Sequence, residues 1–135
     1  MKKILALISF AMLMAFAVSC ERFEENPPYY QISYDMHYIS STGSPTDFSN
    51  IAKEVDPYIN KVLNSENDAV SLYNQILSKT KDASYTANNG SYYKLFVAKY
   101  IAKKESENVI RYEADPSYTS PVGHIWDEQG SRDTK

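Results

Sequence analysis

SYYKLFVAKYIAKK, residues 91–104, is the stretch that decides the fold of this 135-residue chain. Its aromatic residues Tyr92, Phe96 and Tyr100 recur every fourth position and would form one stripe of a helix. The segment is also rich in aromatic and β-branched residues, which favour a strand that is buried on both faces. We predict a strand that forms the centre of a sheet. If the segment were a helix, the sheet would lose its central member and the predicted fold would be wrong.

Three neighbouring segments support a sheet. Residues 30–38 alternate between apolar and polar side chains, which predicts a strand with one buried face. Residues 103–107 are expected to be a charged loop, and Val109–Ala114 to be a partner strand that closes a hairpin. Asn88-Asn89-Gly90 predicts a turn that tolerates positive φ. The apolar members of the alternation are Tyr30, Ile32, Tyr34, Met36 and Tyr38, and the polar ones are Gln31, Ser33, Asp35 and His37.

Helices are expected between the first strand and the central one. Ser44-Pro45-Thr46-Asp47 has the features of a helix start, with Ser at the N-cap, Pro at the first helical position and an acid at the third. Pro57 interrupts the apolar spacing that follows, so we expect a kink or a restart near Asp56. A second start lies at residues 64–68. An amphipathic helix then ends near residues 79–82, where lysines complement the helix dipole.

The order strand, helix, helix, strand, strand predicts an α+β fold, a small two-layer domain in which two helices cover one face of an antiparallel sheet of about three strands. We expect a signal at residues 1–19, an acidic and proline-containing tether at residues 20–28, and the folded domain at residues 29–115. Residues 116–135 contain Pro and Gly among polar residues, so we expect a largely irregular tail with a short ordered patch around Ile125 and Trp126.

The N-terminus has the layout of a secretory signal. Lys2 and Lys3 open the chain, an uncharged run follows over residues 4–18, and small residues approach Cys20. A fifteen-residue helix spans roughly 22 Å, less than the roughly 30 Å hydrocarbon core of a bilayer. We therefore predict a targeting segment that does not span the membrane.

The end of this run allows two processing routes. Ala15-Phe16-Ala17 fits the small-x-small rule for ordinary signal cleavage, which would release a soluble protein with a free thiol. Ala17-Val18-Ser19-Cys20, in contrast, resembles the lipobox of bacterial lipoproteins. The resemblance implies that Cys20 is linked through a thioether to diacylglycerol and becomes the N-terminus after cleavage. Cys20 is the chain's only cysteine, and its alkylation would remove a thiol that risks intermolecular pairing.

A lipidated Cys20 would place the protein in the cell envelope, and we expect the outer membrane, facing either the periplasm or the cell surface. Stable anchoring needs more than one acyl chain, which a diacylated or triacylated cysteine provides. Glu21, Glu24 and Glu25 resemble the export signals of some surface-displayed lipoproteins, although a solvated tether explains them too. Asn26-Pro27-Pro28 predicts a stiff spacer.

The composition narrows the class of partner. The formal charge changes from −3 for the whole chain to −5 when the two lysines of residues 1–19 are removed, which argues against nucleic-acid binding. Twelve tyrosines all follow Cys20. They indicate either an aromatic binding face for an envelope protein or a glycan, or a tyrosine-rich sheet that only packs.

Little in the sequence indicates catalysis or a cofactor. No Gly-x-Ser-x-Gly motif marks a nucleophile and no glycine-rich loop marks a phosphate site, so we expect no cofactor. His124 with Asp127 and Glu128 would offer ligands to a cation, but a polar tail explains the same residues, and we predict no metal site. Asp35, near His37, is the best candidate for a catalytic acid.

The Asn89-Gly90-Ser91 triplet matches a glycan acceptor but is more simply a turn. The sequence as a whole predicts a lipid-anchored, non-catalytic binding or structural module displayed at a membrane. The alternatives are an envelope enzyme that acts on glycan or peptide, and a small tethered inhibitor or immunity protein, since an acidic domain can block a basic cleft.

Overall fold

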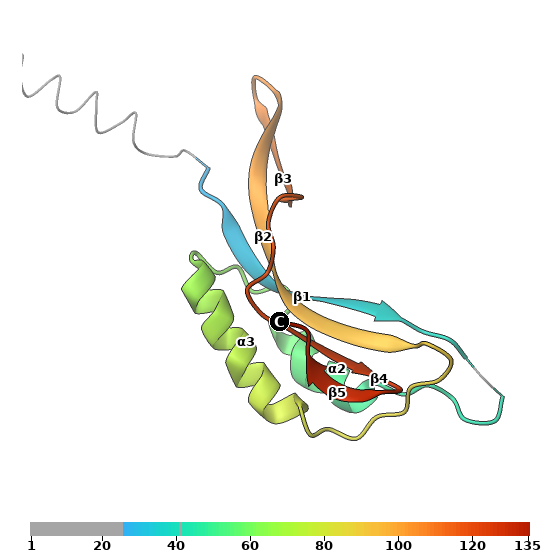
Figure 1. The fold of residues 1–135 in the computed structure, drawn as a ribbon. Coiled ribbons are helices and arrows are strands. Elements are labelled where there is room, and N and C mark those ends of the chain that lie inside the picture. Colours follow the sequence, from blue (N-terminus) through green and yellow to red (C-terminus); the bar gives the residue numbers. More distant parts are fainter. Residues whose placement is uncertain (1–25, 41) are drawn as a thin grey trace, which may run out of the picture.

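In the computed structural model, the described residues are 26–40 and 42–135. The predicted signal, the lipobox and Cys20 lie outside them. Figure 1 shows two α-helices packed against one face of an antiparallel sheet. The elements in chain order are β1 (Tyr29–His37), α2 (Ser49–Val55), the 3-10 helix η1 (Asp56–Tyr58), α3 (Glu66–Thr80), β2 (Tyr92–Ser106), β3 (Val109–Ala114), β4 (Gly123–Asp127) and β5 (Gly130–Asp133).

β2 is the centre of the sheet, as the sequence predicts. Its first part pairs antiparallel with β1 on one side, from Tyr92 opposite His37 to Tyr100 opposite Tyr29. On its other side it pairs first with β4 and then with β3, and β5 extends the sheet beyond β4. Leu95 is buried toward the helices while Phe96 on the opposite face is half-buried, because successive strand residues point to opposite sides.

β3 and β4 lie along the same edge of β2, and residues 115–122 leave the sheet between them. The gap in the ladder is bridged by two hydrogen bonds. The Asp115 amide donates to the Lys99 carbonyl at 2.9 Å, and the Val97 amide donates to Ser120 Oγ at 3.1 Å. Residues 115–122 are therefore held against β2 at both ends, since buried backbone groups must be paired.

The core lies between the sheet and the two α-helices. α3 begins where predicted, with Ser65 Oγ accepting a hydrogen bond from the Asp68 amide at 3.1 Å. The expected interruption at Pro57 is also confirmed, since η1 follows α2 there. None of the described helices is long and apolar enough to cross a membrane. The buried apolar residues are Ile32, Phe48, Ile51, Val55, Ala69, Leu72, Tyr73, Ile76, Tyr93, Leu95, Val97 and Trp126.

The predicted α+β class with an antiparallel sheet and two α-helices is confirmed, but the strand number and order are wrong. The sheet has five strands rather than three, because the expected irregular tail forms β4 and β5. Trp126 in β4 is fully buried, and β4 pairs with β2. The Pro and Gly residues that suggested an irregular tail lie mainly in its connections: Pro116 and Pro121 precede β4, and Gly130, at φ 110°, begins β5.

Three local expectations also differ from the structure. α2 begins at Ser49 rather than after Ser44, because the Asp47 backbone pairs with Thr86 in an isolated bridge that keeps this segment extended. Residues 103–106 continue β2 instead of forming a loop, and two of their charges have partners on β3, Lys103 with Glu113 and Glu105 with Arg111. The apolar side of this alternation is buried at Ile32 but exposed at Tyr34 and Met36, and at Tyr38 just beyond β1, because β1 is an edge strand.

Candidate ligand-binding site

The face of the sheet opposite the helices is called the open face. By strand alternation and the observed register, all five strands contribute side chains to it. They are Tyr29, Gln31, Ser33, Asp35 and His37 of β1, Tyr92, Lys94, Phe96, Ala98 and Tyr100 of β2, Tyr112 and Ala114 of β3, Ile125 and Asp127 of β4, and Arg132 of β5. The open face is thus mixed in character, with aromatic rings among charged groups.

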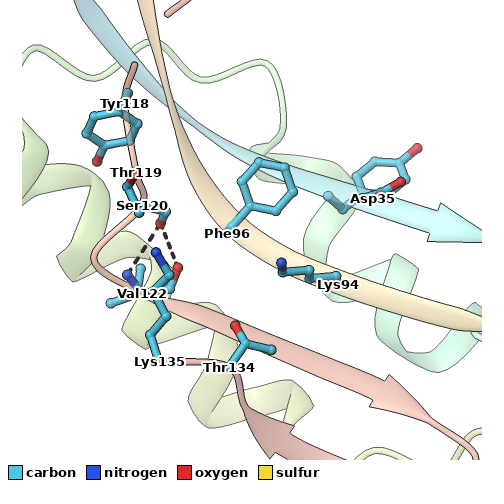
Figure 2. Close-up of a pocket in the computed structure, with 10 residues that line it drawn as sticks. Asp35, Lys94, Phe96, Tyr118, Thr119, Ser120, Val122, Thr134 and Lys135 are labelled. Atoms are coloured by element: carbon cyan, nitrogen blue, oxygen red, sulfur yellow. Dashed lines mark hydrogen bonds between the residues drawn. The ribbon is translucent and has the colours of Figure 1, made fainter. Parts of the chain in front are cut away.

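A pocket of about 550 Å³ lies at this face beside Phe96 (Figure 2). Phe96 supplies an aromatic wall, Asp35 supplies a carboxylate, and Lys94 is one of two lysines that line the pocket. Residues 118–120 and Val122 form the opposite side, and the C-terminal residues Thr134 and Lys135 close one end. The pocket combines apolar surface with a few polar groups, which is the usual composition of a small-ligand site.

Two residues set the shape of this pocket. Gly123 pairs with Phe96 across the strands, and a Cβ at position 123 would collide with the Thr134 hydroxyl, so the missing side chain leaves room beside the ring. Ser120 Oγ donates to the Val122 carbonyl at 2.6 Å while accepting from the Val97 amide. The wall formed by residues 118–122 is consequently fixed to β2 rather than free.

Asp35, the predicted catalytic candidate, lies on the open face, as does its neighbour His37. Asp35 Oδ2 accepts a hydrogen bond from the Tyr92 hydroxyl at 3.1 Å, which raises the pKa of that phenol, and the His37 ring stacks on Tyr92 with centroids 5.9 Å apart. The carboxylate thus faces a phenol, and it also lines the pocket. A position at the pocket wall suits Asp35 to contact a ligand.

The tyrosines serve mainly in packing. Tyr29 stacks on Tyr100 at a centroid distance of 5.0 Å and packs on Tyr112 at 4.9 Å, and Tyr34 stacks on the buried Tyr93 at 5.1 Å. Such pairs contribute about 0.5–1.5 kcal/mol each beyond the area they bury. Of the twelve, only Tyr34 and Tyr38 are exposed large hydrophobic residues in the described chain. The sequence therefore overstates the tyrosine surface that is available to a partner.

His124 joins a second cluster that sequence reasoning did not assemble. Its Nδ1 lies 2.7 Å from Asp133 Oδ1 and its Nε2 lies 2.6 Å from Ser131 Oγ, and the imidazole is buried. Ser131 Oγ also donates to the Lys81 carbonyl at 2.8 Å, at the C-terminus of α3. Local spacing gave no sign of this cluster because β4–β5 pairing and the docking of α3 bring its members together.

The suggested cation ligands His124, Asp127 and Glu128 are directed to different partners. Asp127 receives two hydrogen bonds from the Arg132 guanidinium, at 2.6 and 2.7 Å, which hold the pKa of its carboxyl below its usual range. Glu128 accepts a hydrogen bond from the Gly90 amide at 2.7 Å. Within residues 26–40 and 42–135, no group of three or more His, Cys, Asp and Glu side chains is arranged to hold a metal ion.

Comparison of the chain with protein-family models, with curated proteins and with solved structures finds no match. The site must accordingly be judged on its own geometry.

Proposed function

We propose that this protein is a lipid-anchored binding module of the cell envelope, held at the outer membrane through Cys20. The observation that carries the binding part of the proposal is the pocket at the open face, where an aromatic wall meets one aspartate, two lysines and hydroxyl groups. The anchoring part rests on the likeness of Ala17-Val18-Ser19-Cys20 to a lipobox. Anchoring would raise the local concentration at a membrane, so a weak site suffices.

The ligand class that suits the pocket is a glycan. A sugar ring presents one apolar face to an aromatic wall such as Phe96 and hydroxyl groups to polar neighbours such as Asp35 and Thr134. Lys94 adds a charge that would attract an acidic substituent. We therefore expect oligosaccharides that carry a carboxylate to bind better than neutral ones.

Titration of isotope-labelled protein with soluble oligosaccharides, followed by NMR, tests the binding proposal. We expect shifts at residues 94–96 and 119–122, and loss of binding in Phe96→Ser. Ile110→Ser, a substitution at an exposed position on the distant hairpin, is the control and is expected to leave binding unchanged. Equal effects of the two variants, or shifts elsewhere, would contradict a site at Phe96.

The intact mass of protein from the membrane fraction tests the anchor. We expect a lipid-sized increment that disappears in Cys20→Ala. A mass that corresponds to cleavage after Ala17 with a free thiol would make the protein a soluble secreted one and remove the anchoring part of the proposal. The binding part would then still stand on the pocket.

An envelope enzyme is the second candidate, and the specific observation in its favour is the Ser131–His124–Asp133 arrangement. In a hydrolytic triad the histidine takes the serine proton. Here the single Ser131 proton is donated to the Lys81 carbonyl, so in this arrangement Ser131 has no proton left to give to His124, which favours a structural role. Labelling of Ser131 by a fluorophosphonate, abolished by His124→Ala, would instead establish the enzyme.

The inhibitor alternative draws on the β2–β3 hairpin, which extends beyond the helices in Figure 1. Val109 and Ile110 at its end are exposed, and they are flanked by Glu105 and Arg111, which form an ion pair at 3.0 Å. A protruding segment of this kind is able to enter a partner's cleft. Unchanged binding partners after replacement of both apolar residues by Ser would argue against it.

A further inference from the structure

β1 presents an open backbone edge. The Tyr30 amide and carbonyl point away from β2 and pair with Leu63 at 2.8 and 2.9 Å. Because backbone groups alternate along a strand, those of Ile32, Tyr34 and Met36 point the same way. Ile39 confirms the alternation, since its amide and carbonyl bond inward to Ser91 and Thr46. Among the described residues, the bridge between Tyr30 and Leu63 is the backbone pairing found on the outer edge of β1. The rest of that edge, toward Met36, has no backbone partner among these residues.

The same part of β1 carries exposed apolar side chains. Tyr34 and Met36 have exposed fractions of 40% and 45%, and Tyr38, directly after the end of β1, has 52%; the alternation puts all three on the same side. Unprotected edges with apolar side chains are templates for pairing with another strand, and natural proteins usually blunt them with lysine, proline or a bulge. Residues 32–38 contain no lysine and no proline, and their register with β2 has no bulge.

The edge is complementary to itself. If two copies of β1 pair antiparallel about a two-fold axis at Met36, Tyr34 of one copy faces Tyr38 of the other on the helix side of the sheet. On the open face Asp35 then faces His37, so that a carboxylate meets an imidazole that can donate a hydrogen bond to it. A two-residue shift that puts the axis at Asp35 would place two carboxylates opposite each other, which is unfavourable. The Met36 register also leaves the Tyr30–Leu63 bridge intact.

We propose that two copies of this chain associate through antiparallel pairing of their β1 edges, centred on Met36, to form one continuous sheet of ten strands. The occupant of the edge is a second copy because this strand matches itself in both backbone polarity and side-chain chemistry. Asp35 lines the pocket, so the pairing brings the two pockets to either side of the seam on one shared open face. The proposal stands independently of the ligand that the pocket binds.

Disulfide trapping in the full chain tests the register. Directly opposed residues of a hydrogen-bonded pair have Cα atoms about 5.5 Å apart, within the range that a disulfide bridges. Met36→Cys is therefore expected to give a covalent dimer under mild oxidation. Asp35→Cys is the matched control, because its copies are diagonal neighbours about 7–8 Å apart and are expected to remain largely uncrosslinked. Both cysteine variants are made in a Cys20→Ala background, so that the introduced thiol is the only one in the chain and crosslinking through Cys20 is excluded.

Sedimentation equilibrium tests the association without a crosslink. Met36→Lys puts two ammonium groups at the two-fold axis and is expected to raise the dimer dissociation constant at least tenfold. Ile110→Lys is the control, since Ile110 is as exposed as Met36, at 45%, but lies on β3. Circular dichroism verifies that both variants fold. A monomeric parent chain at 100 µM, crosslinking through Asp35→Cys rather than Met36→Cys, or equal weakening by both lysine variants would overturn the proposal.

Discussion

Replacement of Trp126 tests whether β4 belongs to the core. Trp126 is fully buried, packs edge-on against Tyr93 at a centroid distance of 5.9 Å, and lies 4.6 Å from the His124 ring. Truncation of a buried Trp to Ala costs about 3–5 kcal/mol. A domain of this size has a free energy of unfolding of about 5–15 kcal/mol, so Trp126→Ala should remove a large part of it.

Trp126→Phe should behave differently. In the described chain, Trp126 Nε1 is buried without a hydrogen-bond partner, and an unpaired buried donor costs about 1–3 kcal/mol. Phe keeps an aromatic ring against Tyr93 and removes the unpaired donor. The free energy gained by removing the donor offsets the packing that is lost with the smaller ring. We expect the free energy of unfolding of Trp126→Phe to lie within about 1 kcal/mol of the parent value.

Urea unfolding followed by far-ultraviolet circular dichroism measures both variants, because the chain's only Trp is lost in them. With a slope of about 1–3 kcal/mol per molar urea, Trp126→Ala should lower the midpoint by at least about 1 M. Val62→Ala, at a 55% exposed position, is the control and should change stability by less than about 0.5 kcal/mol. A loss below about 1 kcal/mol in Trp126→Ala would refute the burial of β4 and favour an irregular tail.

Three further predictions concern charge and capping. Arg132 lowers the folded-state pKa of Asp127, so this carboxylate contributes stability above about pH 4 that is lost as pH falls through the lowered pKa. In acid unfolding curves, the difference in free energy of unfolding between the parent chain and Asp127→Asn should therefore shrink below about pH 4. Burial raises the pKa of Tyr73 and Tyr93, so their neutral phenols stabilise the fold below about pH 10, and this contribution is lost as pH rises further. Tyrosinate absorbance should therefore rise in two phases, of which the later one coincides with unfolding. A single early phase would contradict the burial of these two residues. Ser65→Ala removes the N-cap of α3 and should cost about 1 kcal/mol in thermal unfolding, whereas no change would mean that the cap is not formed.

The candidate site was only partly predictable. Asp35 was singled out because alternation placed it on the polar side of its strand, and it does line the pocket. The other walls come from residues 118–122 and from the C-terminal residues, which are brought to Phe96 by the pairing of β4 with β2. The His124 cluster escaped prediction for the same reason, since Lys81 and Ser131 are 50 positions apart.

Local sequence patterns are sufficient to predict the elements that have a local cause. Alternation predicted β1, aromatic and β-branched composition predicted β2, Ser65 predicted the start of α3, and Pro57 predicted the interruption before it. The strands within residues 116–135 depend on tertiary contacts. Short strands between Pro and Gly carry little periodicity, and they gain their stability from pairing with β2 and from the burial of Trp126. Tertiary contacts also determine which part of the apolar face of β1 is covered, since burial at a sheet edge depends on neighbouring elements and not on the strand's own pattern.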